Sequence, residues 1–493
     1  MTLRLSSATL DRLPPAVRRP AYERAALGIG MAHVGVGAFH RCHQAEFTDD
    51  MLEARFGRWG IAGISIRPPA LAATRGAQAG LYTRVLADGE RREARVIGCH
   101  VASIDAQSSP KPALAALADP AVEVVTITVT EKGYCHRPAD GSLDEANPDI
   151  GHDRVGPEAP RSLPGLITAA LDRRRITHGR PLTVISCDNI PGNGTVLAGV
   201  VGSLAAGRPA LADWIAANAA FPSTMVDRIV PATTPADIAG LEAAHGYADG
   251  ALVGGEPFRQ WVIEDRFAGR RPPWDLAGAE FVADVTPFEH LKMRVLNAAQ
   301  STLAYLGLLA GHAHTSDAVA DPRLEAFVRR MLAEESLPTL GPVPGTDTRA
   351  YLDRSLARLR NRAIRHTCHQ VATDGSRKLP QRLVNPAAER LARGEPAPRL
   401  TVAVAAWMSW LVRASDRFGR QWRASDPEAG RVAAIADRTG DDPQALVAGI
   451  LALDTVFAPA LAARPDFRAG LARAHALLLS PDPLRALTIE DHP

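Results

Sequence analysis

The stretch Gly30-Met-Ala-His-Val-Gly-Val-Gly-Ala-Phe-His-Arg41 joins a short apolar run to a segment of helical character. Two glycines one residue apart allow a sharp turn from strand to helix and let backbone N–H groups approach a phosphate closely. A full dinucleotide-binding fingerprint, GxGxxG, has a third glycine where this chain has His40. The motif therefore predicts either a plain strand–turn–helix or a cofactor site made by Gly35, Gly37, Phe39 and His40.

Short β-branched runs alternate with helical stretches through the first half of the chain. The runs are continuously apolar, as expected of strands buried on both faces. This order predicts an α/β fold with a Rossmann-type, doubly wound parallel sheet. The expected strands are 30–35, 61–66, 122–130 and 182–187, and the expected helices are 44–55, 111–118, 165–174 and 194–206.

The pattern changes after about residue 284, where long segments rich in Ala, Leu and Arg follow one another with almost no strand pattern. We expect two domains: a dinucleotide-binding domain over 1–283 and a mainly helical substrate and catalytic domain over 284–493. The helices expected in the second domain are 288–311, 322–335, 349–363, 383–393, 400–416 and 429–439.

Composition restricts the class of partner. The 493 residues carry a formal net charge of +2, with acids and bases well mixed. This gives no electrostatic footprint for nucleic acid or an anionic membrane, so we expect a small-molecule partner and a monomer or small homo-oligomer. Five cysteines without a CxxC pair, and an N-terminus without a signal-peptide pattern, predict a reducing, cytoplasmic location.

His40, Cys42 and His43 form a dense group of possible metal ligands where the glycine motif opens a helix. The spacing does not bring three ligands together, and no second CxxC or HxxxH supports a zinc site. We therefore expect no metal, with one histidine on the turn and the other residues on the helix surface.

The expected helix over 288–311 carries three polar side chains on a largely apolar background: Lys292, Asn297 and Gln300. At about 100° per residue, Asn297 lies roughly 140° round from Lys292 and Gln300 roughly 80°, an arc that the long lysine stem can close. A buried amine beside two amides suits proton transfer at an alcohol or carbonyl carbon.

Polar residues also follow two expected strands, at the edge where a parallel sheet faces its ligand. Asn189, with Asp188 before it, either donates to a substrate oxygen or helps to cap the helix that starts near Gly194. Glu131 follows strand 122–130; a surface turn is the simpler interpretation, and a proton relay is the alternative.

Basic residues raise the question of anion binding. The acid that usually follows the second strand and holds a ribose is missing, and the strand ends in Arg67. An arginine there either accommodates a 2′-phosphate, which would favour NADP, or lies at a solvated strand end. Lys378 and Arg382 are candidate anion binders, with a solvated basic turn as the alternative.

Seven segments, in this order, resemble the mannitol dehydrogenase family of long-chain polyol dehydrogenases. Within that family they resemble fructuronate reductase (mannonate oxidoreductase) most, with mannitol 2-dehydrogenase as the neighbouring branch. The resemblance covers roughly residues 30–400. The segments are GVGAFHRCHQA at 35–45, TVTEKGY at 128–134, SCDN at 186–189, MVDRIVPATTP at 225–235, EPFRQWVIEDRF at 256–267, DVTPFEHLKMRVLNAAQ at 284–300 and DGSRKLPQR at 374–382.

The resemblance implies zinc-independent hydride transfer between NAD(H) and a sugar acid or polyol. D-fructuronate and D-mannonate are the first choice, and mannitol or arabinitol the alternative; the residues keep NADP open. The roles implied are Lys292 as general acid–base, Asn189 and Asn297 as oxyanion donors, Glu131 in a proton path, and Asp227, Lys378 and Gln300 at the substrate.

One residue departs from the family pattern, which usually has histidine where this chain has Gln300. Glutamine can hydrogen-bond a hydroxyl but cannot titrate. The change keeps a rival of another class open, a nucleotide-binding regulator without catalysis.

Overall fold

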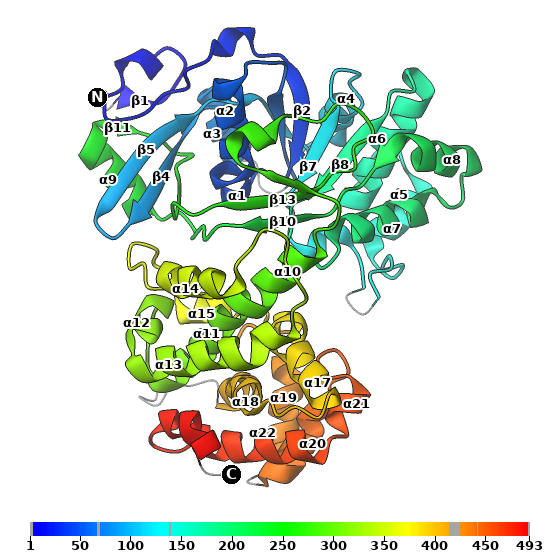
Figure 1. Ribbon diagram of the computed structural model, residues 1–493. Helices are drawn as coiled ribbons and strands as arrows, with labels where there is room; N and C mark the ends of the chain where they lie inside the picture. Colours follow the sequence, from blue (N-terminus) through cyan, green and yellow to red (C-terminus); the bar gives the residue numbers. More distant parts are fainter. Residues whose placement is uncertain (1–2, 67–69, 138–139, 414–423, 441, 492–493) are drawn as a thin grey trace. The chain divides into compact units, whose positions relative to one another are not determined.

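The structure is a computed structural model that describes residues 3–66, 70–137, 140–413, 424–440 and 442–491 (Figure 1). The chain forms two compact units, Met1–Thr286 and Pro287–Pro493. All the strands assigned within the described ranges belong to the first unit, and the second is helical. The predicted fold class, a Rossmann-type α/β domain followed by a mainly helical one, is confirmed.

A six-stranded sheet forms the centre of the first unit (Figure 1). Every neighbouring pair in it is parallel. In chain order the strands lie 3-2-1-4-5-6, the order of dinucleotide-binding folds, and the winding reverses between the first and fourth strands. From one edge to the other they are β6 (His100–Asp105), β3 (Gly60–Ser65), β2 (Ile29–Val34), β7 (Val124–Ile127), β8 (Leu182–Ser186) and β9 (Ala219–Ala220).

One face of this sheet is covered by helices. Ala32 and Val34 of β2 belong to a core cluster with residues of α4 (Pro110–Leu117), α6 (Leu163–Thr177) and α7 (Asn193–Ala205). These three helices cover the sheet on the same side as α5 (Pro148–Val155) (Figure 1). Successive apolar residues of β2 thus pack on opposite faces of the sheet, and both faces are buried, as the continuous apolar run predicted.

The opposite face carries α1 (Ala38–Cys42) and α2 (Gln44–Ala54). Met31 of β2 shares a core cluster with both helices and with an antiparallel pair of strands. That pair, β10 (Thr224–Asp227) and β13 (Gln260–Glu264), brings residues from late in the unit beside α2. This layer was not predicted from the sequence.

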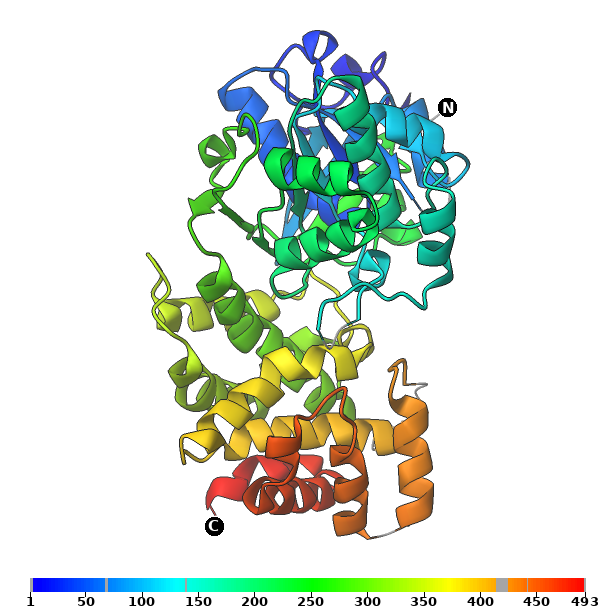
Figure 2. The same cartoon turned by 90° about the vertical axis from the view of Figure 1, so that its right-hand side faces the viewer.

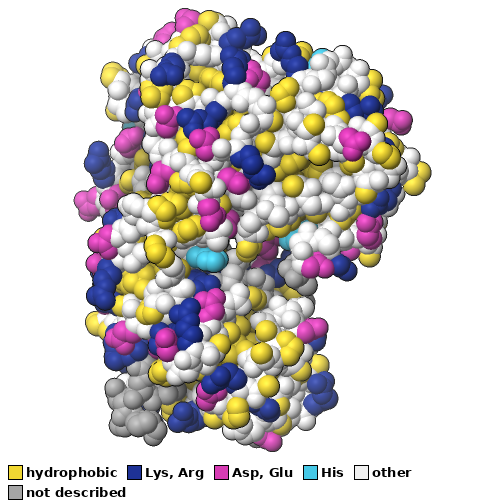
Figure 3. Space-filling view, turned by 45° about the vertical axis from the view of Figure 1, so that its right-hand side comes forward, with side chains coloured by type: hydrophobic (Ala, Val, Ile, Leu, Met, Phe, Trp, Pro, Cys, Tyr) yellow, Lys and Arg dark blue, Asp and Glu magenta, His cyan; other side chains and the backbone are white. Residues whose placement is uncertain are grey.

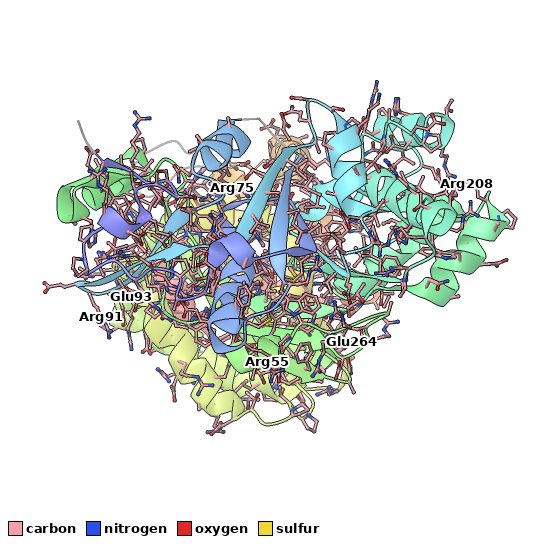
Figure 4. The ribbon with its side chains drawn as sticks, turned by 90° about the horizontal axis from the view of Figure 1, so that it is seen from above. Arg55, Arg75, Arg91, Glu93, Arg208 and Glu264 are labelled. Atoms are coloured by element: carbon pink, nitrogen blue, oxygen red, sulfur yellow. The ribbon has the colours of Figure 1, made fainter. Side chains whose placement is uncertain are left out.

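The main local differences from prediction lie in charged strands. A hairpin of β4 (Tyr82–Asp88) and β5 (Arg91–Ile97) was missed because its charged residues hide the strand pattern. Arg91 and Glu93 lie at the outer end of this hairpin (Figure 4). Strand β7 is shorter than the predicted 122–130, because the chain turns away after Ile127.

The centre of the second unit is α11 (Ala298–Ala310), in which every residue but Gln300 is buried. A helix that is apolar all round belongs inside a core. It packs against α15 (Cys368–Ala372) and α18 (Pro398–Arg413), and α18 packs in turn against α22 (Pro465–Leu478) (Figures 1 and 2).

The other helices expected in this half are present with shifted ends. Three of the expected helices, 288–311, 322–335 and 383–393, include π-helical residues, so a regular α-helix throughout is wrong for all three. The observed elements are α10 (Thr286–Lys292), α13 (Pro322–Arg330), α14 (Thr348–Leu359), α17 (Asn385–Ala392) and α19 (Ala429–Thr439).

The surface carries both signs of charge. On the face shown in Figure 3, Lys and Arg side chains alternate with Asp and Glu, in keeping with the net charge of +2. In the ranges that the structure describes, no helix combines the length and apolar character needed to cross a bilayer.

Candidate active site

The glycine turn lies where the winding of the sheet reverses, between β2 and α1. Gly35 has φ +93°, and a Cβ on it would lie 2.0 Å from the Thr128 carbonyl oxygen, so only glycine fits. Gly37 is exposed, and the nearest atom to a Cβ there, the Gly35 carbonyl oxygen, is 3.9 Å away. The first glycine serves the turn itself, and the second leaves open space for a ligand.

At the third position of the glycine motif, His40 is fully buried inside the first unit. Its ring stacks on His33 with centroids 3.3 Å apart, and its Nε2 lies 3.0 Å from Nε2 of His100. Arg75 donates from Nη2 to Nδ1 of His100 at 2.9 Å. Because a guanidinium only donates, His100 must carry its proton on Nε2 and donate it to His40, which fixes the tautomer of both rings.

Arg75, which makes this contact with His100, lies beside the strands in Figure 4, whereas Arg208 lies at the periphery of the unit.

Cys42 and His43 are fully buried together with His40, so the expected positions on a helix surface are wrong. They are enclosed because α1 lies between the sheet and the β10–β13 pair, and His43 Nε2 bonds the Gln260 carbonyl at 2.8 Å. Over the described part of the chain, no three His, Cys, Asp or Glu side chains form a metal-binding group.

Four histidines buried in the first unit should make the protein sensitive to acid. Burial lowers the pKa of His33 and of His43 to about 3, and holds the pKa values of His40 and His100 well below the usual range. Below pH 6.5 the unfolded chain binds protons that the folded chain does not, so stability falls as pH falls from 6.5 toward 3. We expect a loss of about 2 kcal/mol per buried histidine between pH 7.5 and 5, measured by urea unfolding.

A matched pair of variants tests this dependence. His40→Phe keeps a stacking ring and removes one buried titrating group, so its loss between pH 7.5 and 5 should be smaller by about 2 kcal/mol. Replacing the half-exposed His245 by Gln should leave the wild-type loss unchanged. Equal losses in all three proteins would show that the buried rings do not determine the acid response.

Glu131 and Asn189 follow neighbouring strands of the sheet, β7 and β8. Glu131 begins a 3-10 turn, η3 (Glu131–Tyr134), and is half-buried, while Asn189 is exposed. The helix after Asn189 has Gly192 as its N-cap, so the capping alternative for this residue and Asp188 is wrong. The simpler interpretation of Glu131, a surface turn, holds only in part, because this side chain is half-buried.

Asp188 joins these two segments. Its carboxylate accepts hydrogen bonds from the backbone N–H groups of Val129 (2.9 Å) and Thr130 (3.0 Å) and from the Tyr134 hydroxyl (2.8 Å). The Tyr134 oxygen also bonds the Ser186 hydroxyl. Burial raises the pKa of Asp188, and these donors oppose that rise. The sequence named this residue only as a possible cap.

Asp227 is the last residue of β10 and is 2% exposed. It pairs across the strands with Gln260, whose carbonyl bonds His43. The start of β10 is bonded to the end of β8, where the Thr224 hydroxyl donates to the Ser186 carbonyl at 2.7 Å. The buried carboxylate of Asp227 is therefore carried by a strand that is bonded to the end of β8.

Lys292 and Asn297 lie in the second unit, each 4% exposed. Between them the helix is a π-segment, η5 (Met293–Asn297), in which the Ala298 N–H donates to the Met293 carbonyl five residues earlier. The hydrogen bonds of a π-turn join residues five apart rather than four, so the α-helical spacing of about 100° per residue does not apply between Lys292 and Asn297. The expectation of a regular α-helix is wrong for this segment, so the predicted arc of about 140°, which depends on it, has no basis here.

The surroundings of this segment are polar and tightly bonded. Asn297 Nδ2 lies 2.9 Å from Met293 Sδ. The backbone carbonyl of Asn297 accepts a hydrogen bond from Arg382 at 3.4 Å. Arg382 also donates to the Ser301 hydroxyl at 3.0 Å. Arg294 forms two hydrogen bonds of 2.7 Å with Glu389.

The two basic candidates are not on a solvated turn. Lys378 is half-buried on α16 (Gly375–Leu379), and its ammonium donates to the carbonyls of Val371 and Thr373. Arg382 is buried. Gln300 is half-buried on α11. Arg67 lies outside the described residues.

Comparison with known protein families shows to which family this chain belongs. The mannitol dehydrogenase Rossmann domain matches residues 29–276, and the mannitol dehydrogenase C-terminal domain matches residues 284–478. The chain belongs to the mannitol dehydrogenase family. It is an oxidoreductase of that family, so the rival of a regulator without catalysis is set aside.

Several members of the family are similar over most of their length. D-mannonate oxidoreductase of Escherichia coli (strain K12) is 40% identical over 465 residues, 93% of this chain and 95% of that protein. Mannitol 2-dehydrogenase of Phaeosphaeria nodorum is 37% identical over 88% of this chain and 78% of that one. The structure of Pseudomonas fluorescens mannitol 2-dehydrogenase, a ternary complex with NAD and D-mannitol, superposes with a TM-score of 0.91 at 34% identity, covering 100% of both chains.

Proposed function

We propose that this protein is an NAD-dependent, cytoplasmic oxidoreductase that interconverts D-fructuronate and D-mannonate. The observation that carries the proposal is the 40% identity with D-mannonate oxidoreductase over 93% of the chain. The sequences TEKGYC at 130–135 and DGSRKLPQR at 374–382 support the same branch of the family. A carboxylated sugar also suits the cationic side chains of Lys378 and Arg382.

The first unit fits a dinucleotide. The sheet reverses beside β2, Gly35 makes the turn, and Gly37 leaves the space that a pyrophosphate needs. NAD(H), when bound, supplies or accepts the hydride. The mannitol 2-dehydrogenase complex, with a TM-score of 0.91, contains NAD, which favours NAD over NADP.

The proposed chemistry rests on proton transfer by Lys292. In reduction, its protonated amine donates to the carbonyl oxygen of the keto sugar; in oxidation, the neutral amine takes the hydroxyl proton. Asn189 and Asn297 donate hydrogen bonds to the oxygen as it becomes negative. Glu131 passes protons to and from solvent, and Asp227, Lys378 and Gln300 hold the sugar. Reduction suits neutral pH, because a free lysine with a pKa of about 10.4 is already protonated.

Two glycine variants separate folding from cofactor binding. Gly35→Ala forces a side chain to 2.0 Å from a carbonyl at φ +93°, so we expect a loss of about 1–3 kcal/mol in the free energy of unfolding. Gly37→Ala has room in the protein and should unfold like the wild type, but its methyl enters the ligand space and should weaken NADH binding about tenfold. Urea unfolding and NADH fluorescence titration measure the two effects; normal NADH affinity in Gly37→Ala would place the pyrophosphate elsewhere.

A substrate panel tests the proposed function. D-fructuronate, D-fructose, D-mannonate, D-mannitol and D-arabinitol are assayed with both cofactors at the nicotinamide absorbance. We expect the highest kcat/KM with D-fructuronate and NADH. A higher value for fructose or mannitol would assign the enzyme to polyol oxidation, which the similarity to mannitol 2-dehydrogenase makes the second candidate.

A further inference from the structure

The turn that carries Glu131 is strained at both ends. Thr130 has φ +71° and ψ 161°, a region that is nearly restricted to glycine, and Cys135 has φ +49° and ψ 40°. Such conformations persist only where the surroundings impose them, and they gather at functional sites. The turn between them, η3, therefore needs an external constraint.

That constraint is the Asp188 carboxylate. It accepts the N–H groups of Val129 and Thr130, which are 59 and 58 residues away in the chain, and the hydroxyl of Tyr134 at the far end of η3. One side chain thus binds the turn both before and after Glu131. Charged acceptors form hydrogen bonds about twice as strong as neutral ones, and the half-buried Asp188 carboxylate makes three of them.

The same residue is covalently joined to Asn189. Its own main chain is held as well, since Asn193 Nδ2 donates to the Asp188 carbonyl at 2.9 Å and to the Thr224 carbonyl at 2.9 Å. We propose that Asp188 is a positioning residue that fixes Glu131, after β7, relative to Asn189, after β8. This inference rests on the roles proposed above for those two residues.

Asp188→Asn tests the inference with little change in size. The amide keeps one acceptor oxygen and turns an NH2 group toward the remaining donors, so at least one of the three hydrogen bonds is lost. Small displacements of reacting groups have large kinetic effects, so we expect kcat to fall about tenfold to a hundredfold. The KM for NADH should stay within about twofold, because the glycine turn is untouched.

Asp153 offers a matched control. It is buried on α5 and accepts the same kind of bonds, from the N–H groups of Arg161 (2.8 Å) and Ser162 (2.9 Å) and from the Ser162 hydroxyl (2.7 Å). Asp153→Asn should lower the free energy of unfolding by a similar amount and leave kcat unchanged. The inference is overturned if Asp188→Asn reduces kcat no more than Asp153→Asn does.

Two more variants separate positioning from general damage. In an E131Q background, D188N should have a clearly smaller effect on kcat, since part of its action passes through Glu131; an undiminished effect contradicts the inference.

If D188N does not fold, Tyr134→Phe removes only the hydroxyl contact and should lower kcat about threefold to tenfold at unchanged KM for NADH. A wild-type kcat in Tyr134→Phe would then contradict it. A wild-type enzyme inactive on the whole substrate panel would instead refute the proposed function.

Discussion

Replacement of Lys292 by Ala should lower kcat by about 10²–10⁴-fold while NADH binds with nearly unchanged affinity. The expectation follows from the proposed role of its amine as the proton donor in reduction and the acceptor in oxidation. The residue is 4% exposed on a helix whose backbone is bonded through the π-segment, so the truncation leaves a small cavity and an intact helix. Stopped-flow reduction of D-fructuronate and fluorescence titration of NADH measure the two quantities.

The cavity allows a decisive control. Small primary amines such as methylamine should restore part of the lost rate in Lys292→Ala, in proportion to the concentration of the amine. Lys292→Met fills the same space with an apolar chain and should be equally slow but not rescued. Near-wild-type turnover in Lys292→Ala, or equal rescue of both variants, would exclude this amine as the acid–base group.

Asn189→Ala and Asn297→Ala should each lower kcat by about 10²–10³-fold, which corresponds to about 2.7–4 kcal/mol of transition-state stabilisation. The proposed donors act on an oxygen that becomes negative only during the reaction, so kcat should fall more than KM rises. Asn297→Asp should be slower still, because it replaces a donor by a negative charge. Steady-state kinetics with D-fructuronate and NADH give each value.

A control comes from an asparagine with a purely local bond. Asn218 donates to the Trp214 carbonyl at 3.0 Å at the end of α8 (Pro209–Asn218). Its replacement by Ala should leave kcat within about twofold of the wild type. If Asn297→Asp were faster than Asn297→Ala, the amide would not face a developing negative charge.

The central sheet could be predicted from the sequence because buried parallel strands are continuous apolar runs. The stretch 30–41 predicted β2 to within one residue at each end, and it predicted the turn and the opening of a helix without giving the bounds of α1. The β4–β5 hairpin escaped because β5 begins Arg91-Arg-Glu93 and lacks that signature. The burial of His40 and His43 was not predicted for a related reason. Polar residues near a turn predict an exposed position, and only the tertiary fold encloses these two side chains.

The site was harder to predict than the sheet. Lys292 and Asn297 are polar residues on a largely apolar helix, Asn189 is a polar residue at the end of an expected strand, and their roles stay predictions. The π-turn between two of them was missed, because a hydrogen bond that skips five residues leaves no trace in the spacing of apolar side chains. The contribution of Asp188 depends on partners 54 to 59 residues away, which no local pattern reveals.

In α11, Gln300 is the one position that is not enclosed by neighbouring side chains. Exchanges elsewhere along that helix disturb close packing and carry a folding penalty, whereas an exchange here leaves the packing nearly intact. Since Gln300 is proposed to hold the sugar, we expect new sugar preferences to be most accessible to evolution, and to saturation libraries, at this residue.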